Sequence, residues 1–353
     1  MKPYIDRDTM EVIVAAQWTR VLGEPPRDLD ADFFQSGGDS LKVAQFTAAL
    51  RQALGQEVPM QMTFDAQTFR EISAWLRNGI QLTNRRLVTL SGKGTGIPLV
   101  FLPSGGGGVV RLHHLAAALD RPAYGLQVQG LEPGGGHLLE TVDGLAADFV
   151  QVLEQTDLPR RIHLAGYCSG GIFAYELAGA LHTAGWEIVS VNLLSSSLYS
   201  RQQSMDEIIE ERLSSLAASA GLAPGSYGTD ARTIFREIIS HGSDLVEMDF
   251  AAFEARLRVY GALGAAVVGY TPELLTLPIR LFSTEDRVEP EEILQSPPGV
   301  RDWQEIGLPD FVQHDLPVSH FEMLRHPPTL QFIEASLSNL DREWDAQMTG
   351  LDH

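Results

Sequence analysis

Apolar side chains recur every three to four positions in three segments of the first eighty residues, which is the pattern of amphipathic helices. The first segment covers residues 9 to 22 and ends at Gly23, shortly before a pair of prolines. The second begins at Ser40 and ends at Gly55, and the third covers about residues 67 to 76. No strand pattern occurs before residue 86. We therefore predict an all-α helical bundle over residues 1–80.

The pattern changes after residues 81–97, a segment rich in Gly, Ser, Thr and basic residues that we interpret as a linker ending in an edge strand. Beyond it, short apolar runs rich in branched residues alternate with helical segments, which is typical of an α/β domain with a largely parallel sheet. We place this domain at residues 98–345. Between about residues 200 and 264 the alternation stops, and three helical patterns indicate a lid insertion. The apolar runs are residues 98–102, 123–128, 162–165, 189–194 and 279–282.

The charge of the chain argues against two classes of partner. Its 353 residues include 26 Lys and Arg but 46 Asp and Glu, which leaves a net charge of -20. Such a chain is repelled by phosphate backbones and anionic lipid surfaces, so we expect neither nucleic acid nor a membrane as partner. The sequence starts without an apolar signal core, and no apolar stretch is long enough to span a bilayer. We expect a cytoplasmic protein.

The only cysteine, Cys168, excludes an internal disulfide framework and a multi-cysteine metal site, and we expect no metal. It lies in the segment from Gly166 to Gly170 (GYCSG), between an apolar run and a helical pattern. The arrangement matches the Gly-x-Ser-x-Gly turn that joins a strand to a helix, with Cys in place of Ser. Such a turn exposes Cys168 at a helix N-terminus, which favours the thiolate. The alternatives are a buried, inert Cys168 and a nucleophilic Ser169.

A nucleophile of this kind needs a base and an acid that orients the base, and in this architecture the chain order is nucleophile, carboxylate, histidine. His320, in a loop before the last helical segment, is the predicted base, and the other nine histidines are interpreted as surface or packing residues. Two adjacent carboxylates, Glu285 and Asp286, follow the last apolar run. We prefer Asp286 as the acid, with Glu285 as the alternative.

The predicted oxyanion hole combines two sources of backbone N–H groups. One is Ser169, directly after the nucleophile, and the other is the glycine run after the first buried strand, where we favour Gly106 and Gly107. A glycine run can also cradle phosphate, but no Gly-Lys-Ser or Gly-Lys-Thr follows to complete a phosphate loop.

The segment around Ser40 carries a second motif. Asp32-Phe33-Phe34, followed by Gly37-Gly38-Asp39-Ser40-Leu41, resembles the attachment motif of peptidyl carrier proteins from nonribosomal peptide synthetases. The resemblance implies a four-helix carrier bundle in which Ser40 bears a covalent 4'-phosphopantetheine arm that holds a peptide as a thioester. A hydroxyl at a helix N-terminus is accessible there and tolerates a phosphate. A plain helix cap at Asp39 and Ser40 explains the helix start but not the paired aromatic residues and glycines.

Residues 98 to about 340 resemble the thioesterase domains that end such synthetases, a branch of the α/β-hydrolase fold. The resemblance rests on the segments at residues 101–108, 124–131, 164–177, 270–272 and 320–324. The sequence departs from the family at two places. Most relatives have serine where Cys168 stands, and many carry aspartate after the strand that here ends in residues 193–197, which contain no carboxylate. The second departure favours a relocated acid, Asp286.

Together the motifs predict a peptidyl thioester that passes from the Ser40 arm to Cys168 and is released by cyclisation. Because a cysteinyl thioester keeps the acyl group activated, we expect a strained four-membered ring, a β-lactam or β-lactone, as in antibiotic biosynthesis. The alternatives are a hydrolytic thioesterase that releases a linear peptide and an inactive module that only docks carriers. The expected partners are upstream condensation and adenylation domains and a phosphopantetheinyl transferase, and the chain is expected to be a monomer.

Overall fold

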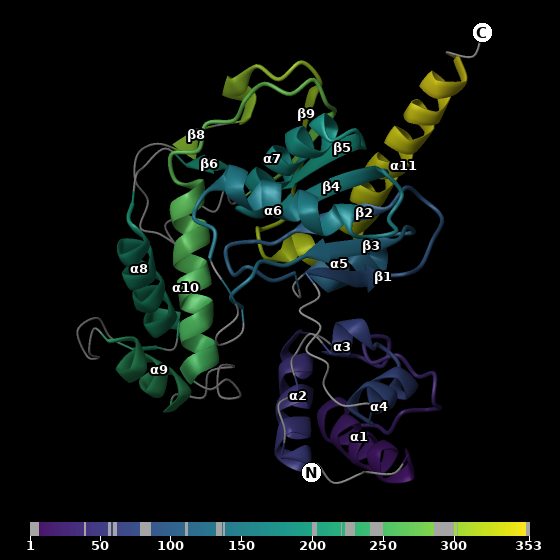
Figure 1. Cartoon of the computed structure of the whole chain (residues 1–353), viewed down its shortest axis with the longest axis vertical. Coiled ribbons are helices and arrows are strands. Elements are labelled where there is room, and N and C mark those ends of the chain that lie inside the picture. The colour runs from purple at the N-terminus through teal and green to yellow at the C-terminus, as the bar shows by residue number, and fades with distance from the viewer. Residues whose placement is uncertain are drawn as a thin grey trace. The chain divides into compact units, whose positions relative to one another are not determined.

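The computed structural model describes most of the chain. The described residues are 7–38, 40–55, 58, 62–77, 86–109, 112–131, 136, 138–199, 203–219, 221–222, 230–240, 250–285, 300–301 and 303–350. They form two compact units, one up to Val88 and the other from Thr89 onward (Figure 1). Within these ranges, no helix is long and apolar enough to cross a membrane.

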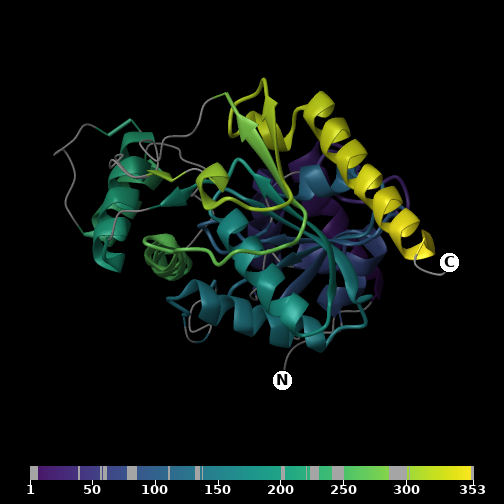
Figure 2. The same ribbon diagram turned by 90° about the horizontal axis from the view of Figure 1, so that it is seen from above.

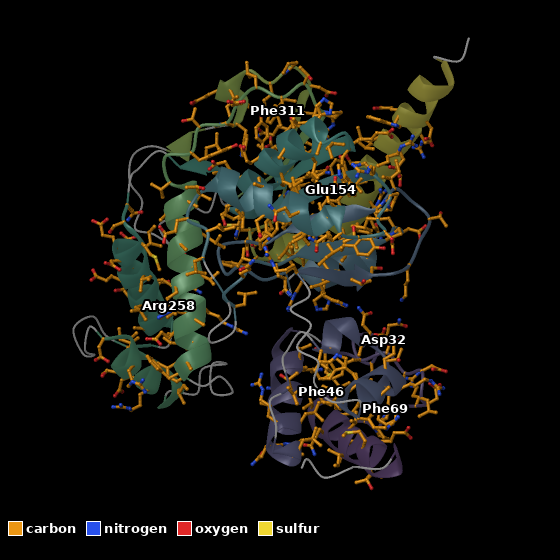
Figure 3. All side chains as sticks on the ribbon, viewed as in Figure 1. Asp32, Phe46, Phe69, Glu154, Arg258 and Phe311 are labelled. Atoms are coloured by element: carbon orange, nitrogen blue, oxygen red, sulfur yellow. The ribbon has the colours of Figure 1, made fainter. Side chains whose placement is uncertain are left out.

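The first unit is helical and packs around one tryptophan. Trp18 is fully buried. Its indole meets the rings of Phe33, Phe46 and Phe69 edge to face, at centroid distances of 5.2, 6.1 and 6.0 Å, and Figure 3 shows Phe46 and Phe69 among the side chains between the helices. The predicted all-α bundle is confirmed, because the helical apolar positions bury one aromatic core. Its helices are α1 (Arg7–Leu22), α2 (Ser40–Leu54), α3 (Met62–Asp65) and α4 (Phe69–Arg77).

The second unit is built on a seven-stranded sheet. In order across the sheet, the strands are β1 (Leu87–Ser91), β3 (Ala123–Leu126), β2 (Leu99–Leu102), β4 (Arg161–Tyr167), β5 (Glu187–Leu194), β7 (Ile279–Thr284) and β9 (Phe311–Leu316). From β3 to β9, neighbouring strands are parallel. Every residue of β2 is buried, and so is every residue of β4 and β5 except the first.

Helices on both faces explain this burial. The helices α6 (Val142–Glu154) and α7 (Gly170–Thr183) pack together on one face, while α5 (His113–Ala118) and α11 (Pro327–Gly350) lie on the other (Figure 2). The predicted α/β-hydrolase class is confirmed. Strand β1 lies at one sheet edge, within the segment interpreted as a linker; the domain limits at residues 80, 97 and 345 stay predictions.

Between β5 and β7 the chain leaves the sheet for the three helices that the spacing predicts, α8 (Met205–Ser219), α9 (Ala231–Ser240) and α10 (Phe250–Val267). Glycines let α10 approach α8 closely. A Cβ on Gly261 would lie 2.7 Å from Ile209, and one on Gly264 would lie 2.8 Å from Ile208. The sequence did not predict the two-stranded ribbon of β6 (Leu198–Tyr199) and β8 (Val300–Arg301), since two residues show no periodicity.

A buried polar network joins α11 to the sheet. The imidazole of His163, on β4, lies 2.7 Å from the Ser190 hydroxyl through Nδ1 and 2.7 Å from Asp341 on α11 through Nε2. Arg121 has no exposed side-chain surface and forms ion pairs with Glu334 at 2.8 Å and with Asp341 at 3.3 Å. The buried charge of Arg121 is thus compensated by two partly buried carboxylates, which is the condition for burying it at all.

Candidate active site

Cys168 lies on a strained turn between β4 and α7. Its φ is +58°, a left-handed conformation that residues other than glycine seldom adopt. The flanking glycines make the turn sterically possible, because a Cβ on Gly166 would lie 1.9 Å from the Gly170 carbonyl oxygen, and one on Gly170 would lie 2.9 Å from that of Pro103. The turn therefore has the geometry of a nucleophile elbow.

The strand ends hold this elbow in place and leave the thiol accessible. The Cys168 N–H donates to the carbonyl of Leu194, the last residue of β5, at 3.0 Å. The side chain is partly exposed. It comes directly before Ser169 and α7, where the positive end of the helix dipole favours a thiolate.

His320 contacts Tyr167, the residue directly before the proposed nucleophile. The Tyr167 hydroxyl donates to the His320 carbonyl at 2.9 Å, and the two rings stack with centroids 4.3 Å apart. Ser319 and Glu322 form a reciprocal capping box at the start of the 3-10 helix η5 (Glu322–Leu324), since the Ser319 N–H donates to the Glu322 carboxylate and the Glu322 N–H to the Ser319 hydroxyl. The predicted nucleophile and base therefore lie in neighbouring loops.

The hydrogen-bond partner of the His320 ring is a residue that sequence reasoning missed. Ser195 Oγ lies 2.7 Å from His320 Nδ1 and 2.9 Å from Thr284 Oγ1. Ser195 directly follows β5 and is the second described non-glycine residue with a positive φ, at +45°. The sequence held a signal for this position, because many relatives carry an aspartate after this strand. This chain has a serine there, and a serine was not considered as a partner of the base.

The predicted acid, Asp286, lies outside the described residues. Its neighbour Glu285 is exposed, and the Glu285 N–H donates to the Val318 carbonyl at 3.1 Å. This bond joins the end of β7 to the His320 loop. The choice between the two carboxylates stays a prediction.

The structure revises the predicted oxyanion hole at one position. The Gly107 N–H donates to the Ser104 carbonyl at 2.8 Å, so the loop itself uses this amide and Gly107 is not the donor we expected. Glycine is needed there for another reason, since φ is +75° and a Cβ would lie 2.5 Å from Val259. Gly106 and the Ser169 amide stay as the proposed donors.

Helix α10 lines the side of the site opposite the elbow. The position of a Cβ on Gly105 lies 3.4 Å from the Tyr260 ring and 3.7 Å from Ser169 Oγ, so this loop lies between α10 and the elbow. The Arg212 guanidinium lies over the Tyr260 ring, 5.0 Å from its centroid. Burial raises the pKa of Tyr260 to about 12, against the opposing effect of Arg212, so the phenol is neutral at physiological pH.

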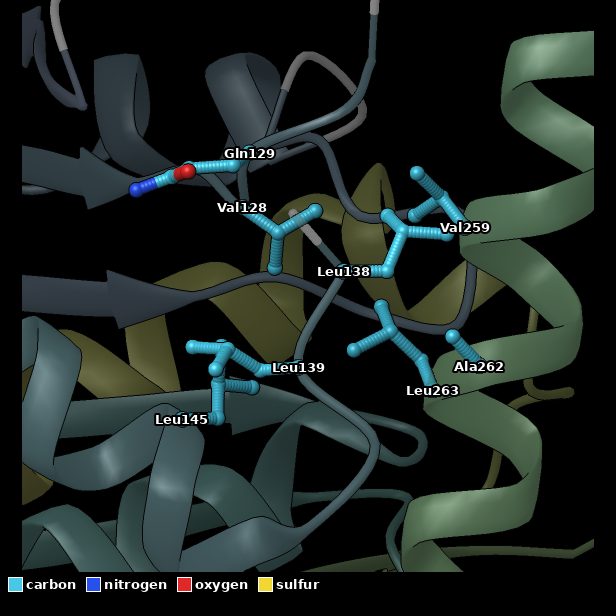
Figure 4. Close-up of a pocket in the computed structure, with 8 residues that line it drawn as sticks. All are labelled: Val128, Gln129, Leu138, Leu139, Leu145, Val259, Ala262 and Leu263. Atoms are coloured by element: carbon cyan, nitrogen blue, oxygen red, sulfur yellow. The ribbon is translucent and has the colours of Figure 1, made fainter. Parts of the chain in front are cut away.

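A small, mostly apolar hollow lies between α10 and the loop after β3 (Figure 4). Val128 and Val259, which meet at Gly107, belong to its lining. The hollow therefore borders the glycine loop near Cys168. Its lining consists of Val128, Gln129, Leu138, Leu139, Leu145, Val259, Ala262 and Leu263.

In the helical unit, the loop before Ser40 is tightly packed. The Asp32 carboxylate accepts the N–H groups of Phe34 and Gln35, both at 2.9 Å. A Cβ on Gly38 would lie 2.4 Å from the Phe33 ring, so only glycine fits there. The paired aromatic and glycine residues of the motif thus shape the loop that leads to α2, which begins at Ser40. A hydroxyl at a helix N-terminus suits a phosphodiester.

No group of three or more metal-binding side chains occurs among the described residues.

Two family models match the chain. The model described as a phosphopantetheine attachment site matches residues 13–76, and the model described as a thioesterase domain matches residues 97–337, which is more than half of the chain. 4'-Phosphopantetheine is thereby confirmed as the covalent cofactor of the first unit.

The chain spans only 10 to 15% of the length of three curated relatives that it matches. It is 29% identical over 231 residues to indigoidine synthase of Dickeya dadantii (strain 3937), covering 65% of this chain and 15% of that protein. It is 28% identical over 256 residues to the dimodular nonribosomal peptide synthase of Bacillus subtilis (strain 168), covering 69% and 10%. It is 30% identical over 192 residues to surfactin synthase subunit 3 of the same strain, covering 54% and 14%.

Solved structures share the fold at low sequence identity. A four-domain nonribosomal peptide synthetase, holo-AB3403, matches 98% of this chain with 27% of its own, at a TM-score of 0.58 and 18% identity. The type II thioesterase BorB matches 71% of this chain with 97% of its own, at a TM-score of 0.51 and 21% identity. The resemblance to the carrier–thioesterase didomain of nonribosomal peptide synthetases is confirmed. The chain belongs to the thioesterase domain family and carries a phosphopantetheine attachment domain ahead of its thioesterase domain.

Proposed function

We propose that this chain is the carrier–thioesterase part of a nonribosomal peptide synthetase, and that it releases a peptide from its carrier by cyclisation through an acyl group on Cys168. The observation that supports this best is the elbow itself. A partly exposed thiol with a φ of +58° stands at a helix N-terminus beside the loop of His320.

Ser40 is the residue proposed to hold the 4'-phosphopantetheine arm, at the start of α2 and after the packed glycine loop. When bound, the arm supplies a thiol that carries the peptide as a thioester. Lys42, whose ammonium donates to the Gly37 carbonyl at 2.7 Å, lies in the first turn of the helix and adds positive charge near the attachment point.

In the first step, the substrate is the peptidyl thioester. His320 accepts the proton of the Cys168 thiol, and the thiolate attacks the thioester carbonyl. The Ser169 and Gly106 amides stabilise the tetrahedral oxyanion. His320 gives this proton to the leaving sulfur, which becomes a free thiol, and a thioester on Cys168 remains. Asp286, two residues beyond Thr284, is the proposed source of negative charge that stabilises the imidazolium.

In the second step, a nucleophile within the peptide attacks the acyl carbon on Cys168. His320 takes the proton of that nucleophile and returns it to the departing Cys168 sulfur, so the ring closes and the free thiol is regenerated. An oxyester on serine would be less reactive than this thioester. A weak internal nucleophile that closes a strained ring gains most from that difference, so we propose a β-lactam or β-lactone as the product class.

The test is the mass of the released product. The full chain is loaded at Ser40 with a candidate peptide by a phosphopantetheinyl transferase, and the products are followed over time. A product one water lighter than the linear acid supports cyclisation. A linear acid as the sole product would contradict cyclisation and indicate hydrolytic release. An absence of release would favour a docking module.

Matched variants make this test specific. Ser40→Ala should prevent loading, whereas Cys168→Ala should permit loading and block release. Release from the Cys168→Ala protein would contradict the covalent route.

The partners that the whole protein would use follow from the same proposal. Upstream condensation and adenylation domains supply the peptide, and a phosphopantetheinyl transferase installs the arm on Ser40. We propose that the chain is a monomer, which gel filtration with light scattering tests.

A further inference from the structure

The Ser195 hydroxyl lies between two polar groups of the site. It is 2.7 Å from His320 Nδ1 and 2.9 Å from Thr284 Oγ1. Three different elements meet there, since Ser195 follows β5, Thr284 ends β7 and His320 lies in the loop after β9. The hydroxyl therefore joins two strand ends to the base.

The backbone holds Ser195 firmly in this position. Its N–H donates to the Phe282 carbonyl at 2.8 Å, and the carbonyl of the preceding residue, Leu194, accepts the Cys168 N–H at 3.0 Å. Its φ of +45° is a conformation that serine rarely adopts without support from its surroundings. The same strand end thus supports both the nucleophile and the group that contacts the base.

We propose that Ser195 is a positioning residue of the Cys168–His320 pair, whose hydroxyl accepts the Nδ1 hydrogen of His320 and so fixes the tautomer that can act as base. This inference rests on the proposed function. A base that receives the Cys168 proton at Nε2 must carry its own hydrogen at Nδ1. That hydrogen then points to Ser195 Oγ, and the Ser195 hydroxyl donates in turn to Thr284 Oγ1.

A hydroxyl in this position has a particular chemical consequence. It orients the imidazole as a carboxylate would, but it brings no negative charge into direct contact with the ring. A thiol loses its proton far more readily than an alcohol, so cysteine demands less of the base than serine does.

The test uses the fact that Cys168 is the only cysteine of the chain. The full chain is treated with iodoacetamide between pH 5 and 10, and the alkylation rate of Cys168 is measured by mass spectrometry. The midpoint of this profile reports the thiolate that His320 stabilises and requires no peptide substrate.

Three variants are compared with the parent chain. Ser195→Ala removes the acceptor and should move the midpoint upward by about one pH unit, which lowers the rate at pH 7 about tenfold. Ser195→Asp supplies a charged acceptor, tolerates the left-handed backbone and should move the midpoint downward by about one pH unit. Ser196→Ala is the matched control, since the neighbouring Ser196 hydroxyl is buried with no hydrogen-bond partner among the described residues, and it should leave the midpoint unchanged.

A parent midpoint below that of an ordinary thiol, about 8.5, with Ser195→Ala and Ser195→Asp both equal to the parent, would overturn the role of Ser195 and leave the proposed function standing. A parent midpoint at the ordinary value would contradict the activated cysteine, and the role of Ser195 with it. If Ser195→Ala does not fold, as judged by circular dichroism, the direction of the Ser195→Asp shift alone decides.

Discussion

Among the described residues, His163 and His320 each lie 2.7 Å from a serine hydroxyl through Nδ1, and His320 is the one proposed to act in catalysis. His163 also lies 2.7 Å from a carboxylate, Asp341, so its contacts have the composition of a complete Ser-His-Asp triad. Both imidazoles are buried, but His163 and Ser190 lie in the middle of the sheet. His320 lies where the carboxyl ends of the strands meet, and it contacts Tyr167, the residue directly before the strained and partly exposed Cys168. Position in the fold, more than the set of hydrogen bonds, distinguishes the two.

The role proposed for His320 requires the tautomer opposite to that of His163. An ionised Asp341 can only accept, so His163 Nε2 carries the hydrogen and Nδ1 accepts from the Ser190 hydroxyl. Burial is the main cause that lowers the pKa of His163, and the contact with Asp341 only partly offsets it. This neutral histidine serves the packing of α11, whereas the proposed role of His320 needs the hydrogen on Nδ1 and a ring that can take up a second proton.

The largest difference in release rate is expected between a variant of Cys168 and a variant of the buried Ser190. Cys168→Ala should lower the rate of peptide release at least about 1,000-fold, because the covalent route is lost. Ser190→Ala should leave the release rate close to that of the parent chain. Single-turnover release from the Ser40-loaded chain measures both, and a large loss in the Ser190 variant would show that the buried triad takes part in the reaction.

Replacing His320 should lower the release rate, whereas replacing His163 should lower the free energy of unfolding. His320→Gln should lower the release rate about 100-fold or more, because general base catalysis is lost. His163→Gln should keep the release rate but lower the free energy of unfolding by about 1 to 3 kcal/mol, because buried partners lose their hydrogen bonds. Release kinetics and urea unfolding of the full chain test this, and equal kinetic losses in both variants would remove the distinction.

The two histidines also differ in the carboxylate assigned to each. His163 has Asp341 in contact, while Asp286 is the acid proposed for His320. Asp286→Asn should reduce release about tenfold or more, and Glu285→Gln, which changes an exposed side chain, should have little effect. A larger loss in the Glu285 variant would reassign the acid.

The smallest expected effect concerns stability against pH. Burial holds the pKa of His163 below 6.5, so below pH 6.5 the unfolded chain binds a proton that the folded chain does not. The free energy of unfolding should therefore fall as the pH is lowered from 6.5, by at most about 1.4 kcal/mol per pH unit for one proton. Burial lowers the pKa of His113 to about 4, which adds to the fall in the same direction.

Urea unfolding at a series of pH values measures this slope. His163→Gln should reduce the slope, while His182→Gln, at an exposed position on α7, should not change it. An unchanged slope in the His163 variant would mean that the buried ring titrates alike in the folded and unfolded chain.

Local sequence signals were sufficient for the elements and for the elbow. The helical spacing around Trp18, the continuous apolar runs of the central strands and the glycines around Cys168 each describe interactions within a short segment or with one neighbouring layer. The oxyanion loop was predicted only in part. Whether an amide such as that of Gly107 is engaged within its own loop depends on a turn whose backbone conformation the glycine run leaves open.

The partner of the His320 ring could not be predicted in the same way. Ser195 and His320 are separated by 125 positions and come from different elements, so their contact exists only once β5, β7 and β9 are side by side. A serine after a strand has no local feature that distinguishes an orienting hydroxyl from any other.

By itself, the sequence determined that this protein has a helical bundle with a serine at a helix start and an α/β unit with one cysteine on a glycine-flanked turn. Those features depend on side-chain periodicity and on steric limits within a few residues. The tertiary structure alone decided that Ser195 meets His320 while Ser190 meets His163. The register and order of the parallel strands bring these groups together, and both are set by the packing of the whole sheet.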